Sequence, residues 1–250
     1  ILNKKIRLVD YETLTNARGQ RVVAFGRYAG LVGAYNAIWT YGQRYNLFSI
    51  KRANDCFDLE ELKHELTQVK LPAIKIVLTG GGRVAKGAME IMSSLGIRKV
   101  TPARFQEEDF DHPVYTQLNT RDYVAAANGE DFIREEFYKH PEKYINDFLK
   151  YSRHADVLIA CAFWDPRAPV LFERKDMMRS DFKIRIIADI TCDIEGSIPS
   201  TKRPATIEDP VYDYDPSGDT VDPPFSDEGN ISVMAVDNLP CELPRNASED

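Results

Sequence analysis

The sequence predicts an α/β protein built on a doubly wound parallel sheet, and three observations lead to this prediction. Apolar runs recur at residues 74–78, 156–160 and 184–189, and continuous runs of this kind are typical of strands covered on both faces. Helical patterns separate the runs. A glycine-rich turn directly follows the first of them. Strands that alternate with helices of this length indicate parallel βαβ units.

The composition is that of an ordinary globular protein. Of the 250 residues, 43% are hydrophobic and 28% are charged, which suits a folded core. The net charge of −7 argues against a nucleic-acid partner, because no basic excess exists to neutralise phosphates. No apolar run approaches the ~20 residues that a membrane span needs. The four cysteines lie far apart without CxxC pairing, which predicts reduced thiols in the cytoplasm rather than a zinc ribbon or a disulfide framework.

In the first part of the chain, the residue pattern predicts a strand at residues 6–9 and then a buried helix. Residues 30–48 are rich in glycine, alanine and aromatic residues, with small residues three and four positions apart. This spacing lets a helix approach another backbone closely. Residues 51–72 predict a linker helix, because Asp58 and Glu61 have the spacing of a capping box. Four apolar residues then form one stripe of this helix: Leu59, Leu62, Leu66 and Val69.

Residues 73–250 predict a single nucleotide-binding domain. The remaining elements follow in chain order: a helix after the glycine turn, strands at 98–101 and 114–118, two helical pieces within 129–151 divided at Pro141, and a strand at 231–236. Residues 191–230 place prolines among acidic and hydroxyl residues and predict a long irregular loop. Both ends of the chain look cut, so we expect a piece of a longer protein.

The glycine turn predicts a Rossmann-like dinucleotide site. Gly80, Gly82 and Ala85 match the pattern G-x-G-x-x-A, in which the glycines allow a tight turn and close approach of the backbone to a pyrophosphate. A helix that begins near Arg83 and Val84 would aim free N–H groups at that pyrophosphate. The expected cofactor is NAD, with NADP as an alternative. A tight turn kept only for packing is the other interpretation.

The usual carboxylate for the ribose is missing from the sequence. An Asp or Glu is expected about 20 residues after the glycine turn, at the end of the second strand, but residues 98–104 contain none. Thr101 is the candidate for a hydrogen bond to a ribose hydroxyl, whereas Arg98 or Arg104 would favour a 2′-phosphate. Weak or lost nucleotide binding is the remaining alternative.

Several segments resemble one superfamily of dehydrogenases. Four of them occur in the order seen in the alanine dehydrogenase / pyridine nucleotide transhydrogenase superfamily: residues 80–88, 160–163, 188–193 and 234–240. Three others resemble the lysine-forming saccharopine dehydrogenases: residues 9–12, 21–30 and 236–248. The long closing run is more specific than the glycine turn.

This resemblance implies two Rossmann-like domains with the active site in the cleft between them. Residues 1–50 would be the C-terminal part of the substrate domain with its connecting helix, so the catalytic lysine and histidine of the family would precede residue 1. The resemblance also implies cofactor contacts beyond Gly80 and Thr101, at these positions: Gly82, Arg83, Val84, Phe163, Val236, Asp237, Asn238 and Leu239.

Two carboxylates are candidate catalytic residues. Glu12 resembles a family carboxylate close to the substrate amine, where it would tune neighbouring acid–base groups; a solvated glutamate is the alternative. Asp193 follows the strand at 184–189, where α/β sheets bind ligands, with loop capping as the alternative. No histidine or cysteine has a partner at metal-ligand spacing, so we expect no metal.

The expected function is that of an NAD(P)-dependent oxidoreductase acting on the C–N bond of an amino-acid substrate, as in the conversion of saccharopine to lysine and 2-oxoglutarate. We expect this chain alone to bind without catalysing. The alternatives are an alanine dehydrogenase or transhydrogenase-like enzyme and a non-catalytic nucleotide-binding module. The oligomeric state stays open.

Overall fold

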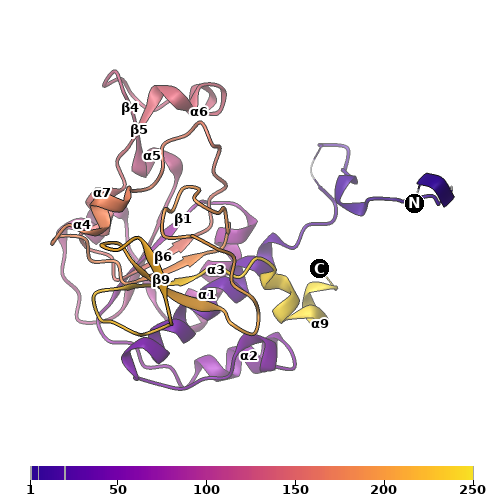
Figure 1. Cartoon of the computed structure of the whole chain (residues 1–250), viewed down its shortest axis with the longest axis horizontal. Helices are drawn as coiled ribbons and strands as arrows, with labels where there is room; N and C mark the ends of the chain where they lie inside the picture. Colours follow the sequence, from indigo (N-terminus) through magenta and orange to yellow (C-terminus); the bar gives the residue numbers. More distant parts are fainter. Residues whose placement is uncertain (1, 5, 20, 250) are drawn as a thin grey trace.

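A computed structural model describes residues 2–4, 6–19 and 21–249. Within these residues, eight strands form one sheet in the order β2-β3-β1-β6-β7-β10-β8-β9 (Figure 1). The strands from β2 to β10 in this order are parallel, and β8 and β9 are antiparallel to their neighbours. The bounds are β1 Lys75–Thr79, β2 Arg98–Lys99, β3 Val114–Leu118, β6 Val157–Ala160, β7 Ile186–Asp189, β8 Val211–Asp215, β9 Thr220–Asp222 and β10 Ile231–Met234. The predicted α/β fold is confirmed.

Both faces of the central strands are buried, which explains their continuous apolar sequences. On β1, Ile76 and Leu78 face one hydrophobic core, and Val77 between them faces a second core on the other side of the sheet. The same alternation holds along β6, where Ile159 faces the first core and Leu158 the second. Helices must therefore cover both faces of the sheet.

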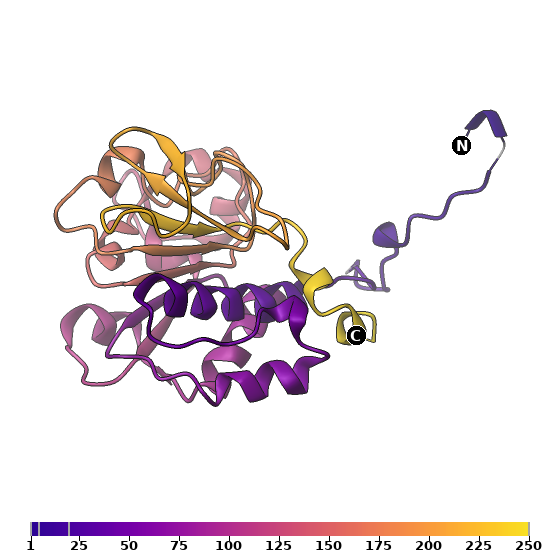
Figure 2. The same cartoon turned by 60° about the horizontal axis from the view of Figure 1, so that its bottom comes forward.

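Three helices contribute to the first core: α1 Gly26–Tyr45, α2 Leu59–Leu66 and α3 Arg83–Ser94. They lie together below the sheet in Figure 2. Shorter helices pack against the second core: α4 Pro102–Glu107, α7 Leu149–Ser152 and α8 Arg174–Met177. Among the described helices, none combines the length and apolar character needed to cross a membrane.

Helices α1 and α3 touch backbone to backbone, as the small residues of the first helix predicted. A Cβ atom on Gly30 would overlap the carbonyl oxygen of Val84, and one on Gly87 would overlap the carbonyl oxygen of Arg27. Arg27 also donates two hydrogen bonds of 2.8 Å to the Glu90 carboxylate. The crossing therefore fixes α3, whose first turn faces the end of β1.

The remaining elements are a small two-stranded unit, one short helix near the C-terminus and five 3-10 helices within the described residues. A two-stranded sheet of β4 Val124–Ala126 and β5 Tyr144–Asn146 forms one small unit with α5 Thr120–Tyr123 and α6 Arg134–Lys139 (Figure 1). Near the C-terminus, α9 spans Pro244–Ala247. The 3-10 helices are η1 Leu2–Lys4, η2 Tyr11–Thr13, η3 Ala53–Asp55, η4 Pro141–Lys143 and η5 Leu239–Glu242.

Two of the predicted elements are wrong near residues 6–9 and 129–151. Residues 6–9 form no strand, and Ile6, Leu8 and Val9 are exposed, because no neighbouring strand of the described chain pairs with them. From Pro141 the chain forms the 3-10 helix η4, then strand β5 and the short helix α7, rather than a single second helix. Tyr144 is buried there whereas Ile145 is 53% exposed, and this alternation belongs to a strand.

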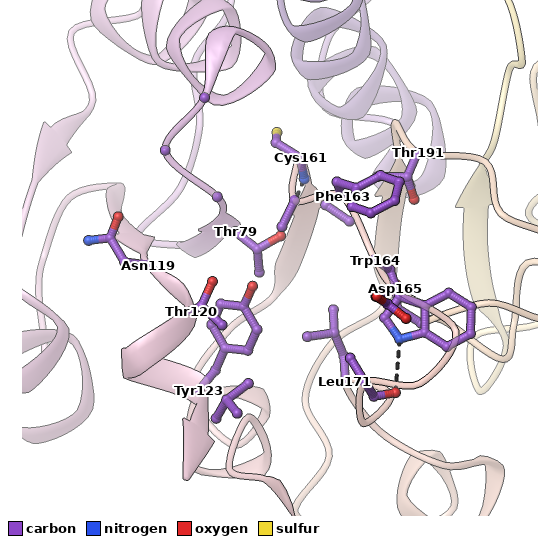
Figure 3. A pocket seen from close by; sticks show the side chains of 18 of the residues that line it. Thr79, Asn119, Thr120, Tyr123, Cys161, Phe163, Trp164, Asp165, Leu171 and Thr191 are labelled. Carbon is purple, nitrogen blue, oxygen red and sulfur yellow. Dashed lines mark hydrogen bonds between the residues drawn. The ribbon is translucent and has the colours of Figure 1, made fainter. Parts of the chain in front are cut away.

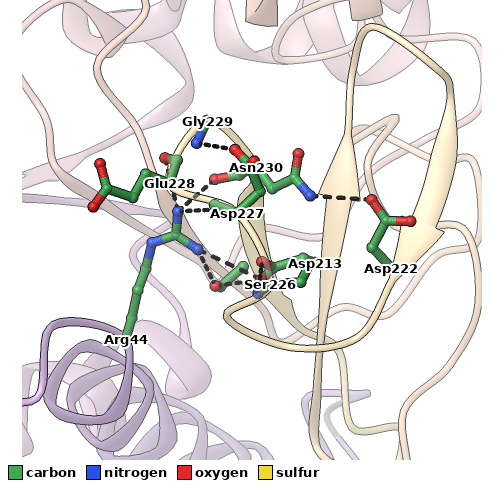
Figure 4. A network of polar contacts seen from close by, with 9 residues as sticks. Arg44, Asp213, Asp222, Ser226, Asp227, Glu228, Gly229 and Asn230 are labelled. Atoms are coloured by element: carbon green, nitrogen blue, oxygen red, sulfur yellow. Dashed lines mark hydrogen bonds and ion pairs between the residues drawn. The ribbon is translucent and has the colours of Figure 1, made fainter.

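The irregular loop predicted for residues 191–230 is also corrected, because β8 and β9 lie within it. Tyr212 and Tyr214 point into the second core, while Asp213 between them is buried with Arg44 of α1 beside it at 3.5 Å (Figure 4). The aspartate looks like a loop residue in the sequence, but the distant arginine compensates its charge in the sheet.

Candidate functional site

The carboxyl ends of β1, β3, β6 and β7 border a cavity of about 1100 Å³. In Figure 3, Asn119, Thr120 and Tyr123 approach it from one side, and Phe163, Trp164 and Leu171 from the other. The cavity lies where β3 and β6 flank β1, which is the place where open α/β sheets bind ligands.

The turn after β1 is built from glycine because its neighbours are close. Gly80 has φ +91°, and a Cβ atom there would lie 3.1 Å from the Cα atom of Ala162. Its N–H group donates to the carbonyl oxygen of Leu118 at 2.8 Å. Gly82 is different, because a Cβ atom there would meet nothing within 4 Å. The backbone at Gly82 therefore borders open space on the cavity side.

Helix α3 begins at this open position. Gly82 is its N-cap residue and no side chain caps it. Arg83 and Val84 in the first turn line the cavity, whereas Ala85 is fully buried. An uncapped first turn leaves N–H groups and the positive end of the helix dipole for an anion. The residues present thus fit a pyrophosphate group.

The loop after β6 forms the far wall of the cavity. Phe163 is 89% exposed and lines the space with Trp164, whose indole N–H donates to the Ala168 carbonyl oxygen at 3.2 Å. Arg167 donates two hydrogen bonds to Asp165 and lowers the pKa of that carboxyl to about 2. Cys161 is buried, which raises the pKa of its thiol, so it is packed as a small apolar residue.

Two aspartates follow the β7 strand with different surroundings. Asp189 is buried and accepts hydrogen bonds of 2.7 Å from the hydroxyls of Thr191 and Thr201. Burial raises the pKa of this carboxyl, although the hydrogen bonds oppose the shift. Asp189 therefore holds its loop in place. Asp193 lines the cavity and stays a candidate for the site.

Several predicted site residues lie outside the cavity lining. The Thr101 hydroxyl accepts the Arg104 N–H at 3.3 Å and caps α4. Glu12 falls in η2, and its side chain lies outside what the structure describes. The four cofactor contacts predicted beyond β10 are divided between the core and the surface: Val236 and Leu239 are buried, whereas Asp237 and Asn238 are exposed. The cavity thus brings together Gly80, Gly82, Arg83, Val84, Phe163 and Asp193.

Sequence reasoning missed the wall formed by the segment after β3. Asn119, Thr120 and Tyr123 line the cavity, as do aromatic residues of the small β4–β5 unit: Phe132, Phe137 and Tyr138. Their contribution depends on which strand neighbours β1, and the pattern of the sequence does not specify this. The one available signal was that Asn119 directly follows the apolar strand 114–118.

Comparison with known proteins gives two groups of relatives. No family model matches the chain. Alpha-aminoadipic semialdehyde synthase of Arabidopsis thaliana is 28% identical and matches 100% of this chain but 27% of its own length. The mitochondrial enzyme of the same name from Rattus norvegicus is 27% identical, with 100% and 31% covered. The lysine-forming, NAD(+)-dependent saccharopine dehydrogenase of Neurospora crassa is 25% identical, with 97% and 57% covered.

Among solved structures, an L-alanine dehydrogenase superposes with a TM-score of 0.52 at 15% identity, over 96% of this chain and 54% of that one. This likeness shows the fold. The chain spans less than a third of the two synthases and just over half of the dehydrogenase. Its homologues are thus the alpha-aminoadipic semialdehyde synthases and the lysine-forming saccharopine dehydrogenases, and its fold is that of alanine dehydrogenase.

Proposed function

We propose that this chain is the nucleotide-binding part of an NAD(P)-dependent amino-acid dehydrogenase that resembles saccharopine dehydrogenase. The observation that carries the proposal is the uncapped first turn of α3 beside Gly82, open to a cavity of about 1100 Å³. A pyrophosphate at this position would accept hydrogen bonds from the backbone N–H groups of Arg83 and Val84. The names of the relatives support an amino-acid substrate.

The dinucleotide would cross the carboxyl edge of the sheet. Its nicotinamide, which supplies the hydride chemistry when bound, would lie on the β6–β7 side between Phe163 and Asp193, both of which line the cavity. Phe163 would exclude water from that half of the site. Asp193 would orient the carboxamide or a substrate amine through a hydrogen bond, and Glu12 would tune the acid–base groups of the substrate side.

The proposed substrate is saccharopine, converted to lysine and 2-oxoglutarate, with residues 1–50 belonging to the substrate domain and its connecting helix. Residues 51–72 would be the linker and residues 73–250 the nucleotide-binding domain. The proposal uses no cofactor contact at Val236, Asp237, Asn238 and Leu239, because these residues do not line the cavity and Val236 and Leu239 are buried in the first core.

Calorimetric titration of the full chain with NADH and NADPH tests the proposal. We expect one or both to bind with a dissociation constant below the millimolar range, and Gly82→Ala to weaken that binding. The variant Ser93→Ala is the control for expression and handling, because Ser93 lies exposed in the last turn of α3 and outside the cavity lining. If neither dinucleotide binds, the proposed function is wrong.

A further inference from the structure

We propose that residues 124–146, called the lid below, close over the cavity toward the loop after β6 when a dinucleotide binds. The lid contains β4, α6, η4 and β5 and stands apart from the eight-stranded sheet, at the top of Figure 1. This inference rests on the proposed function for its ligand, and it adds a movement of the chain to the binding step.

The lid has a small core of its own. The rings of Phe132, Phe137 and Tyr144 lie with their centroids 5.7, 5.5 and 5.3 Å apart, and aromatic pairs at such distances attract one another beyond the effect of burial alone. The Tyr144 hydroxyl also donates to the Ile133 carbonyl oxygen at 3.1 Å. Strands β4 and β5 pair with each other in a sheet separate from the main one. The lid can therefore move as one body without breaking these contacts.

The lid is attached to the rest of the molecule at its base. Val124 and Tyr144 belong to the second core, and the Asn146 side-chain amide donates to the Leu171 carbonyl oxygen at 2.6 Å. Beyond this base, every residue of α6 is exposed or half-buried. This arrangement gives the lid a fixed base and an outer end that can pivot.

Apolar surfaces face each other across the cavity. Phe132, Phe137 and Tyr138 line it from the lid. Trp164 and Pro169 line it from the loop after β6. Closing without a ligand would leave voids in which these side chains lose van der Waals contacts. A bound dinucleotide fills that space, so the ligand favours the closed arrangement through contacts that the open one does not offer.

Charges on the two sides of the opening are complementary. Glu142 in η4 pairs with His140 at 3.2 Å, and Arg167 in the loop after β6 pairs with Asp165 at 2.7 Å. A backbone hydrogen bond, the His140 side chain and the charge of Arg167 together lower the pKa of the Glu142 carboxyl. Glu142 and Arg167 thus attract each other across the opening. Neither of them lines the cavity, so a substitution at Glu142 acts on the lid rather than on the ligand.

The base of the lid is connected to the glycine turn. The Gln117 side-chain amide donates to the Gly80 carbonyl oxygen at 2.8 Å and to the Asn119 Oδ1 atom at 3.2 Å. Helix α5, which Asn119 caps, leads directly into β4. A ligand on the first turn of α3 therefore lies beside the residues from which the lid extends.

Stopped-flow measurement of NADH fluorescence on the full chain tests the inference. We expect a fast phase whose rate rises with NADH concentration, and a slower phase that reaches a constant rate and reports closing. Replacing residues 128–142 by Asn-Gly removes α6 and most of η4. The Ala127 N–H donates to the Lys143 carbonyl oxygen at 2.9 Å, so a two-residue turn can join the strands there. This deletion should abolish the slower phase and speed NADH release about tenfold or more.

A charge reversal tests the lid without deleting it. Glu142→Arg replaces the attraction to Arg167 with repulsion, and it should speed NADH release about threefold or more while leaving the fast phase within about twofold. Glu135→Arg is the matched control, because Glu135 is also exposed in the lid and lies outside the cavity lining. It should leave both phases within about twofold.

The outcomes separate this inference from the proposed function. A single binding phase in the unmodified chain, or unchanged NADH release from the folded deletion variant, would overturn the inference alone. Equal effects of Glu142→Arg and Glu135→Arg would also overturn it, because the net charge of the lid would then explain the change. Failure of both NADH and NADPH to bind would overturn the proposed function as well. If the deletion variant does not fold, the charge reversal and its control still decide the question.

Discussion

At the scale of single residues, a substitution at Gly82 should weaken dinucleotide binding without destabilising the fold. Its φ of −81° is open to any residue, and a Cβ atom there would meet no protein atom within 4 Å. We therefore expect Gly82→Ala to change the free energy of unfolding by less than about 1 kcal/mol. Dinucleotide binding should weaken about tenfold or more, because the methyl group occupies the space in which the pyrophosphate approaches the backbone. Urea unfolding and calorimetry on the same samples check the two expectations.

The outcome that would contradict this prediction is unchanged affinity in a folded Gly82→Ala chain. Such a result would mean that the ligand does not approach α3 at this point, whatever its identity. A large loss of stability would instead show that the open space beside Gly82 is filled by protein.

Asp189 gives a prediction about pH. Burial raises the pKa of its carboxyl above the ordinary 3.8, so the folded chain binds this proton more tightly than the unfolded chain does. The carboxyl thus stabilises the folded state at low pH, and this contribution is lost as the pH rises from 3.8 through the raised pKa. Asn in its place does not titrate. We expect the stability of the unmodified chain minus that of Asp189→Asn to fall between pH 3.5 and pH 7.

Urea unfolding of both chains across this pH range measures the difference directly. Other carboxyls titrate in both chains, so their contributions cancel in the subtraction. A difference that stays constant, or that grows with pH, would show that the hydrogen bonds from Thr191 and Thr201 outweigh the burial of Asp189.

At the scale of elements, the crossing of α1 and α3 positions the first turn of α3. A Cβ atom on Gly30 would overlap the Val84 carbonyl oxygen. Both positions are fixed by helix backbone, so the overlap is relieved only if one whole helix moves. We expect Gly30→Ala to lower the free energy of unfolding by about 1–3 kcal/mol, as overpacking does. Because Val84 also lines the cavity, dinucleotide affinity should fall as well.

Gly82→Ala is the matched control for Gly30→Ala, since it adds the same methyl group 52 positions along the chain in open space. Urea midpoints of the two variants should differ clearly, with only Gly30→Ala shifted. If Gly30→Ala is as stable as the unmodified chain, the two helices are further apart than described.

The sequence predicted those elements whose signals are local. Helix α2 begins where Asp58 accepts the Glu61 N–H at 2.9 Å, as the capping-box spacing indicated, and β1, β6 and β7 follow their apolar runs. The glycine turn was likewise found from its own residues. The positions of β3 and β8 depend on partners far away in the sequence: β3 on its pairing with β1, and β8 on an arginine 169 residues earlier. The cavity wall after β3 was missed for the same reason.

At the scale of the whole molecule, Arg44 joins the first helix to the antiparallel end of the sheet (Figure 4). It donates hydrogen bonds to the Asn230 carbonyl oxygen and to the Ser232 hydroxyl at 2.8 Å each, and it lies 3.5 Å from the Asp213 carboxylate. The Arg44 side chain is 5% exposed and that of Asp213 is fully buried. One side chain therefore connects α1, β8, β10 and the loop between β9 and β10.

We expect Arg44→Met to lower the free energy of unfolding by about 3–5 kcal/mol, because it leaves a buried carboxylate without its cation. Lys143→Met removes a cation from an exposed pair with Glu136 and should cost only about 0–1 kcal/mol. Adding Asp213→Asn to Arg44→Met should restore part of the loss, since the uncompensated charge is then gone. If urea unfolding shows equal losses for Arg44→Met and Lys143→Met, the antiparallel strands are held by their apolar face alone, and Arg44 contributes no more than a surface charge.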